Sequence, residues 1–249
     1  MTDTAQLSRR PSVLRMADGG IHFDGVKAVD GVTLEVRSGE VLGLIGPNGS
    51  GKTSTLNLLS GMLRATSGRI HLDDDDLTRS SMRQRVQRGV VRTFQSGRVF
   101  GRLTVAENVE AAALGAGSRR GPARRLRDEI LDELNLGAVA DTRADSLTAG
   151  RIRTTAIARA LAAKPRFLLL DEPAAGQNET EAVELITSIR GFARRRDCGV
   201  LLVEHDMSVV MGTCDRLHVL DSGRTVVEGE PATVRKDPRV IEIYFGKRH

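Results

Sequence analysis

Apolar and polar residues alternate along GVTLEV, residues 31 to 36, and this pattern predicts a strand with one face exposed to solvent. Nearly every residue of VLGLIG, residues 41 to 46, is apolar, which is typical of a central strand covered on both faces. We therefore expect a small antiparallel layer over residues 22 to 36 that leads into a parallel core.

Helical spacing follows the second of these strands. Leu56, Leu59 and Met62 recur at intervals typical of a helix, and SGRIHL, residues 67 to 72, then predicts a return to strand. From about residue 101 to 163 the chain is rich in Ala, Leu and Arg, with few β-branched runs. We expect helices here, interrupted at residues 115 to 122 and 134 to 146.

Two more short apolar strands are predicted in RFLLLDEP and GVLLVEHD, with a helix over residues 179 to 196 between them. Strands that alternate with helices predict an α/β fold with a parallel sheet, into which the helical middle of the chain is inserted. The segment from residue 216 to 234 predicts a C-terminal hairpin that turns at DSGR.

The composition fits one globular unit that can bury a large core: 249 residues, of which 40% are hydrophobic and 28% charged. The longest apolar runs are far shorter than the roughly 20 residues that a transmembrane helix needs. The first 15 residues contain arginines but no apolar stretch of the kind found in a secretory signal. We expect a cytoplasmic chain whose first residues form a tail.

Other features are predicted to have ordinary structural roles. Cys198 and Cys214 lack metal-ligand or redox spacing and are interpreted as small core residues. The acidic run at residues 73 to 76 is interpreted as a solvated turn. The net charge of +5 comes mostly from arginines crowded at residues 83 to 102 and 119 to 127. Solvated helix faces are favoured for these, with an acidic partner or an anionic membrane surface as the alternative.

GPNGSGKT, residues 46 to 53, fits the phosphate-binding loop G-x-x-x-x-G-K-[ST]. Its glycines let the backbone turn with N–H groups directed at phosphate, and the following helix N-terminus adds positive potential. Lys52 is expected to reach the β and γ phosphates, and the Thr53 hydroxyl to bind Mg²⁺.

FLLLDE supplies a second element at the tip of an apolar strand. Asp171 is positioned to hold Mg²⁺ through water, and Glu172 to polarise the attacking water. Acidic residues are common at strand ends, so this assignment depends on the presence of a phosphate-binding loop in the same chain.

Five motifs, GPNGSGKT, VRTFQ, LTAGR, LLLDEPAAGQN and LLVEHDM, occur in the order seen in the ATP-binding cassette subunits of ABC transporters, and the chain resembles these from about residue 12 to 247. The resemblance implies a RecA-like P-loop NTPase fold with ATP and Mg²⁺ as ligands. It places one cassette domain at 12–247, with the core at about 12–95 and 162–247, a helical subdomain at about 96–161, an antiparallel β layer near the N-terminus, and a flexible tail at 1–11.

The resemblance also implies a role for each motif residue. Phe23 falls where the family stacks an aromatic ring on adenine, although it could instead pack the small sheet. Gln95 corresponds to the glutamine that touches Mg²⁺ and links the core to the helical insertion. His205 corresponds to the switch histidine, which contacts the γ-phosphate and holds Glu172 and the water. His22, His71 and His218 have no such setting and are interpreted as incidental.

The implied site has three sets of residues within one chain. The catalytic residues are Lys52, Glu172 and His205. The metal-binding residues are Thr53, Gln95 and Asp171. The nucleotide-binding residues are Phe23, Gly46, Pro47, Asn48, Gly49, Ser50, Gly51, Lys52, Thr53 and Ser54.

Family members act as head-to-tail dimers, in which each ATP lies between the phosphate loop of one cassette and the signature of the other. The signature here is Thr148, Ala149, Gly150 and Arg151. Thr148 keeps a hydroxyl and Gly150 an unobstructed amide. Arg151 replaces the usual neutral glutamine, and we expect Arg151→Gln to change hydrolysis. The interface loop contains Gly176 and Asn178.

The resemblance implies partners that the chain does not contain. These are a second cassette, identical or paralogous, and integral membrane permease subunits that dock near Arg98, Phe100 and Arg102, with a periplasmic or surface solute-binding protein acting indirectly. The cassette would then lie peripherally at the inner face of the membrane. DEPAAG and VIEIYFG are most similar to branched-chain amino acid importers and their hydrophobic-amide and urea relatives.

Two alternatives stay open at this stage. The altered LTAGR signature is compatible with a cassette that binds nucleotide and gates transport with weak hydrolysis. The basic charge permits a soluble nucleic-acid-associated ABC ATPase, although such members usually carry two cassettes or a long coiled coil, so no nucleic-acid partner is expected.

Overall fold

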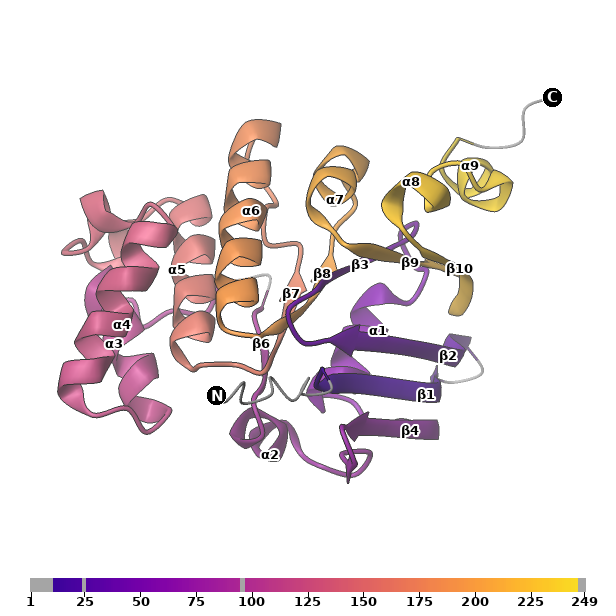
Figure 1. Cartoon of the computed structure of the whole chain (residues 1–249), viewed down its shortest axis with the longest axis horizontal. Helices are drawn as coiled ribbons and strands as arrows, with labels where there is room; N and C mark the ends of the chain where they lie inside the picture. The colour runs from indigo at the N-terminus through magenta and orange to yellow at the C-terminus, as the bar shows by residue number, and fades with distance from the viewer. Residues whose placement is uncertain (1–10, 24–25, 95–96, 246–249) are drawn as a thin grey trace, which may run out of the picture.

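The protein is described by a computed structural model that covers residues 11–23, 26–94 and 97–245 (Figure 1). Residues 1–10 of the expected tail lie outside this range. The described chain is an α/β structure with two sheets, a parallel core and several helices, as predicted.

The larger sheet has the strand order β10-β9-β3-β8-β7-β6, and all of its strands except β10 run parallel. Its strands are β3 (Val41–Ile45), β6 (Val90–Arg92), β7 (Phe167–Asp171), β8 (Gly199–Val203), β9 (Arg216–Asp221) and β10 (Arg224–Gly229). Every residue of β3, β7 and β8 is buried, which confirms the central strands predicted from apolar runs. The predicted C-terminal hairpin is β9–β10, with Asp221 paired to Arg224.

The smaller sheet is antiparallel and confirms the predicted β layer. Its order is β2-β1-β4-β5. The strands are β1 (Val13–Phe23), β2 (Val26–Arg37), β4 (Ser67–Leu72) and β5 (Asp75–Asp76).

Helices separate and flank the sheets. They are α1 (Lys52–Ser60), α2 (Met82–Gln87), α3 (Val105–Gly115), α4 (Arg120–Glu133), α5 (Ala149–Ala162), α6 (Glu179–Arg195), α7 (Met207–Thr213), α8 (Pro231–Val234) and α9 (Pro238–Phe245), with 3₁₀ turns at Gly137–Val139 and Ala144–Ser146. Figure 1 shows α3, α4 and α5 together beyond the β6 edge of the large sheet, which is the helical region predicted for the middle of the chain.

Alternation along β3 divides the core into two apolar clusters. Leu42 and Leu44 belong to the cluster that contains Leu56 of α1 and the inner face of the small sheet, whereas Val41 and Ile45 belong to the cluster under α6 and α7. Helix α1 is therefore packed between the two sheets, and its first residue is fixed at the end of β3.

Three local predictions were wrong. Helix α1 ends at Ser60 because Gly61, with φ +76°, caps it, so Met62 is 47% exposed and not on the helix. The acidic run is exposed throughout, but only residues 73 and 74 form the predicted turn, because residues 75 and 76 form β5. His218 is fully buried and structural: its ring nitrogens lie 2.8 Å from Glu228 Oε2 and 2.9 Å from Thr225 Oγ1.

The predicted core role of the cysteines is confirmed. Cys198 and Cys214 are buried, and burial raises the pKa of each thiol to about 12.

Arg85 lies in the arginine-rich stretch that was interpreted as solvated, yet its side chain is only 1% exposed. Its guanidinium donates to the carbonyls of Leu58 (2.5 Å) and Leu59 (2.8 Å), near the C-terminus of α1, and to that of Leu77 (2.7 Å). Burial lowers the pKa of Arg85 to about 10, against the opposing effect of the Asp76 carboxylate. The residue therefore caps the helix that carries the phosphate loop.

We expect Arg85→Met to lower the free energy of unfolding by about 3 kcal/mol or more, because several buried carbonyls would lose their donor at about 1–3 kcal/mol each. Urea unfolding followed by circular dichroism measures this. Arg88→Met is the control, because the Arg88 side chain is 44% exposed, and it should change stability by less than about 0.5 kcal/mol. Equal effects of the two substitutions would contradict the capping role.

Candidate nucleotide-binding site

Three adjacent parallel strands end at the same level of the large sheet. Val203 of β8 pairs with Leu44 of β3 on one side and with Asp171 of β7 on the other. The phosphate loop follows β3, Glu172 follows β7, and His205 follows β8. The register of the sheet thus brings together the phosphate loop, Glu172 and His205, which are distant from one another in the sequence.

The phosphate loop has the backbone that its glycines predict. Gly46 and Gly51 have φ +151° and +103°. A Cβ at Gly46 would lie 2.1 Å from the Leu220 carbonyl oxygen, and one at Gly51 would lie 2.5 Å from that of Ala28. Only glycine fits at either position. The intervening Ser50 hydroxyl is buried and has no hydrogen-bond partner among the described residues, which suits a donor to phosphate.

Lys52 is the first residue of α1 and is 7% exposed. Its ammonium donates to the carbonyls of Gly46 (2.8 Å) and Pro47 (2.9 Å), so it bridges the loop. Burial lowers the pKa of Lys52, whereas the carboxylates of Glu172 and Asp171 act to raise it. The lysine is held where phosphate oxygens can replace the two carbonyls.

Asp171 and Glu172, adjacent in the sequence, differ in their surroundings. The Asp171 side chain is 9% exposed and the Glu172 side chain 27%. Glu172 has φ +46°, in the left-handed region, and its N–H donates to the Val203 carbonyl at 3.0 Å. The chain therefore makes a strained turn at Glu172, immediately after β7 ends at Asp171.

The side chains present fit Mg²⁺ that is shared with a nucleotide. Thr53 offers a hydroxyl and Asp171 a carboxylate, which are the hard oxygen donors that Mg²⁺ prefers. Within the described ranges there is no cluster of three or more His, Cys, Asp or Glu side chains that could hold a metal by themselves. Water and phosphate oxygens would have to complete the coordination.

His205 lies between two carboxylates. Its Nδ1 is 4.0 Å from Glu172 Oε1 and 3.7 Å from Glu204 Oε2, and its side chain is 63% exposed. Glu204 is 2% exposed, and it accepts the N–H of Ala174 (3.2 Å) and of His205 (3.3 Å). Burial raises the pKa of the Glu204 carboxyl, and these N–H groups partly oppose that rise. Glu204 therefore holds the backbone of His205, while the imidazole stays exposed near Glu172.

Two predicted ligand contacts have different outcomes. Gln95 lies outside the described residues, although β6 leads directly to it. Phe23 ends β1 with its ring 45% exposed, and the strand that follows passes the loop, because the Ala28 carbonyl lies against Gly51. The exposed ring is available for stacking, and that role remains a prediction.

The signature begins α5. Thr148 is the N-cap, with φ −65° and ψ 157°, and its hydroxyl accepts the Arg151 N–H at 3.5 Å. Ala149 is exposed, and no atom lies within 4 Å of a Cβ placed on Gly150. The amides at this helix N-terminus are therefore accessible to an anion.

The Arg151 side chain is bonded within the helical region of its own chain. It donates to the Asn135 carbonyl (2.7 Å), just after α4. It lines a cavity of about 540 Å³ together with Gly176 and Gln177 of the interface loop. The signature is thus tied to the rest of the helical region by the residue that departs from the family pattern.

The interface loop has a local structural role in this chain. Gly176 has φ +80°, and Asn178 caps α6 by accepting the Glu181 N–H at 2.9 Å. Arg153 of α5 donates to the Ala175 carbonyl, so the signature helix and this loop are in contact. Whether Gly176 and Asn178 contact a second cassette stays a prediction.

The sequence reasoning missed two buried residues at this edge of the sheet. Arg92 donates to Asp171 Oδ2 at 2.8 Å, and Glu204 supports His205. Glu204 could have been noticed, because it is an acid at the end of an apolar strand, as Asp171 is. Arg92 gave no such signal within its arginine-rich stretch.

The fold and this site define a nucleotide-binding protein of the P-loop NTPase class. Residues 29–175 match the ABC transporter family, and residues 224–249 match the branched-chain amino acid ATP-binding cassette transporter family. The chain belongs to the ABC transporter family as an ATP-binding subunit, a class of ATPases that drive transport.

Similar proteins cover nearly the whole chain. The high-affinity branched-chain amino acid transport ATP-binding protein LivG of Salmonella typhimurium is 39% identical over 91% of this chain and 95% of its own length. The lipopolysaccharide export system ATP-binding protein LptB of Haemophilus influenzae is 37% identical over 95% and 98%. The ADP conformation of MJ1267, an ATP-binding cassette of an ABC transporter, has a TM-score of 0.82 at 30% identity over 95% and 99%.

In the part of the chain that the structure covers, no helix is both long and apolar enough to cross a membrane.

We expect Arg151→Gln to lower ATP hydrolysis in the assembled dimer by roughly three- to tenfold, because it removes a hydrogen bond of about 1 kcal/mol that fixes the signature against the end of α4. Steady-state phosphate release from matched dimers measures this. Arg120→Gln, an exposed arginine of α4, is the control and should retain the wild-type rate. Equal rates for Arg151→Gln and wild type would show that the tie has no role in turnover.

Proposed function

We propose that this chain hydrolyses ATP to power a bacterial ABC importer for branched-chain or other hydrophobic amino acids or amides. The observation that carries the proposal is the convergence of Lys52, Glu172 and His205 at one sheet edge. A site that only bound nucleotide would need the lysine but not an acid beside an exposed imidazole.

Each of these side chains has a distinct task in the proposed reaction. Lys52 leaves the carbonyls of the loop and binds the β and γ phosphates. Glu172 orients and polarises the attacking water, while His205 holds Glu172 and contacts the γ-phosphate. Mg²⁺, held by Thr53, Asp171 and Gln95, would neutralise the charge that develops on the phosphates.

The proposed unit is a head-to-tail dimer. The cavity at the signature is lined by the two residues that follow α4, by α5 and α6 and by the interface loop, and no residue of the phosphate loop of the same chain lines it. The amides of Ala149 and Gly150 therefore do not face the phosphate loop of their own subunit. A second cassette, identical or paralogous, would supply the ATP that this signature contacts.

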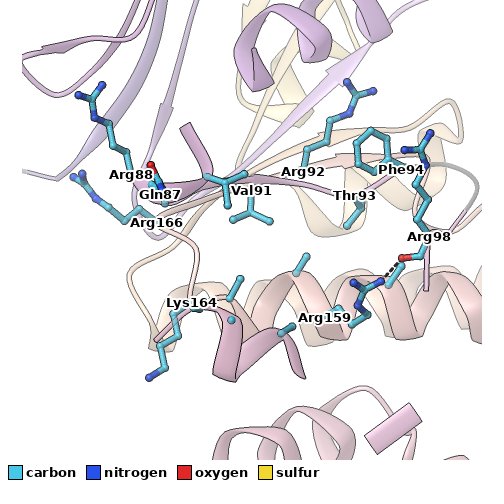
Figure 2. Close-up of a pocket in the computed structure, with 18 residues that line it drawn as sticks. Gln87, Arg88, Val91, Arg92, Thr93, Phe94, Arg98, Arg159, Lys164 and Arg166 are labelled. Atoms are coloured by element: carbon cyan, nitrogen blue, oxygen red, sulfur yellow. Dashed lines mark hydrogen bonds between the residues drawn. The ribbon is translucent and has the colours of Figure 1, made fainter. Parts of the chain in front are cut away.

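A groove between the sheet and the helical region is the proposed docking site for permease subunits (Figure 2). Its volume is about 790 Å³, and its charged lining residues are all basic: Arg88, Arg92, Arg98, Arg159, Lys164 and Arg166. Arg159 donates to the Arg98 carbonyl across the groove and lies over the Phe100 ring, 4.4 Å from its centroid. Of the three residues expected to dock a permease, Arg98 lines the groove, Phe100 adjoins it, and Arg102 is exposed nearby.

The direction of transport and the solute rest on similarity. LivG is named for branched-chain amino acid transport, and the C-terminal match is to the same class, whereas LptB is named for lipopolysaccharide export. We favour import because the C-terminal family match, residues 224–249, is to the branched-chain amino acid class, which agrees with the similarity to LivG. The permease would hold the cassette at the inner face of the membrane, and a solute-binding protein would deliver the substrate outside.

We expect Glu172→Gln to reduce the single-turnover hydrolysis rate by about 100-fold or more while ATP binding is retained, because the substitution removes the base and keeps the phosphate contacts. The control is Glu179→Gln, an exposed residue of the first turn of α6. If wild type itself hydrolyses ATP as slowly as Glu172→Gln, with its permease present, the gating alternative is correct and the proposal is wrong.

We expect Arg98→Glu to reduce co-purification with the adjacent permease subunits by at least about tenfold without altering ATP affinity, because it reverses a charge in the basic groove. Arg125→Glu makes the same change on the exposed face of α4 and should leave the complex intact. Proteoliposomes that contain the complex then report the solute: uptake of labelled leucine supports import, and release of lipopolysaccharide supports the export reading. Loss of the complex with Arg125→Glu but not Arg98→Glu would place the docking surface elsewhere.

A further inference from the structure

Arg92 lines the groove of Figure 2, but its guanidinium points away from α5 and into the core. The residue ends β6, and its side chain is 6% exposed. An arginine is rarely buried to this extent unless its charge is compensated. The contacts of Arg92 show what that compensation is.

Arg92 connects two parts of the nucleotide site. Its Nη2 donates to Asp171 Oδ2 at 2.8 Å, at the end of β7. Its Nη1 donates to Asn57 Oδ1 and lies 3.5 Å from Ser60 Oγ, both on α1. The same helix begins with Lys52 and Thr53. One guanidinium therefore fixes the metal-binding carboxylate relative to the helix of the phosphate loop.

The charge of Asp171 needs this partner. Its side chain is 9% exposed, and Arg92 is its one ion-pair and hydrogen-bond partner within the described ranges. Lys52 is close enough to be influenced by Asp171, but its ammonium is bonded to the carbonyls of Gly46 and Pro47. A buried carboxylate without a counter-charge is strongly unfavourable.

We propose that Arg92 is the counter-cation of Asp171 in the nucleotide-free protein, and that it keeps this carboxylate from binding a free divalent cation until ATP brings Mg²⁺ with it. The guanidinium occupies one carboxylate oxygen and repels a second cation nearby. The phosphates of ATP add enough negative charge to offset that repulsion. Arg92 is thus a positioning residue for the metal site. This inference rests on the proposed metal role of Asp171, but its tests do not depend on hydrolysis.

Binding of Mn²⁺ in the absence of nucleotide, measured by electron paramagnetic resonance, tests the electrostatic part. We expect Arg92→Gln to bind Mn²⁺ at least about tenfold more tightly than wild type, because a nearby cation has been removed. Arg92→Lys keeps the charge and should resemble wild type. Arg83→Gln, an exposed arginine of α2, is the matched control and should also bind as wild type does. Equal Mn²⁺ affinity for Arg92→Gln and wild type would overturn the proposal.

A double-mutant cycle on thermal stability tests the pairing even if Arg92→Gln folds poorly. Arg92→Gln should lower the melting temperature strongly in the wild-type background and much less in the Asp171→Asn background, where no buried charge is left unpaired. Additive effects, or failure of the double variant to regain stability relative to Arg92→Gln, would overturn the pairing.

The two assays separate this inference from the proposed function. If Asp171→Asn leaves Mn²⁺ affinity unchanged in the presence of ADP, Asp171 is not a metal residue, and both the metal assignment and the Mn²⁺ prediction are wrong. The stability cycle would then still report whether Arg92 compensates the charge of Asp171.

Discussion

The site depends on the parallel pairing of β3, β8 and β7. Because Leu44, Val203 and Asp171 lie side by side, the residues that follow each strand meet at one edge of the sheet. A shift of one residue in either pairing would turn the affected side chains to the opposite face of the sheet. Apolar side chains on both faces of these strands fix the register. The central core therefore determines where the residues of the site lie relative to one another.

Charge balance is the second constraint at this edge. The ammonium of Lys52 is bonded to carbonyls of its own loop, Asp171 to Arg92, and Glu204 to backbone amides. The buried charges of the site are therefore compensated by the chain itself. On binding, ATP and Mg²⁺ would replace some of these contacts. The groups that bind them would already be held in place by the chain. His205 and Glu172, for which we propose roles on the attacking water, are the more exposed of the ionisable groups.

The sequence predicted those features that are encoded locally. The glycines of residues 46 to 51, the apolar strands and the acids at the end of β7 each occupy a few consecutive positions, so their pattern is visible without the fold. Arg85 and Arg92 could not be predicted in this way, because their partners are the end of α1 and Asp171, distant in sequence. An arginine-rich stretch was interpreted as solvated, and only tertiary contacts show that two of its members are buried. His218 was missed for the same reason, and Gly61 ended α1 earlier than its apolar spacing suggested.

The central claim is that one chain supplies a complete phosphate-loop half of an ATP site and that a second cassette supplies the signature half. The most direct test is an experimental structure of the hydrolysis-blocked Glu172→Gln chain with Mg²⁺ and ATP. The account predicts a head-to-tail dimer in which Lys52 has left the Gly46 and Pro47 carbonyls for the phosphates, and in which the γ-phosphate is contacted by Thr148 and Gly150 of the other cassette. ATP enclosed by a single chain, with the signature amides free of phosphate, would contradict it.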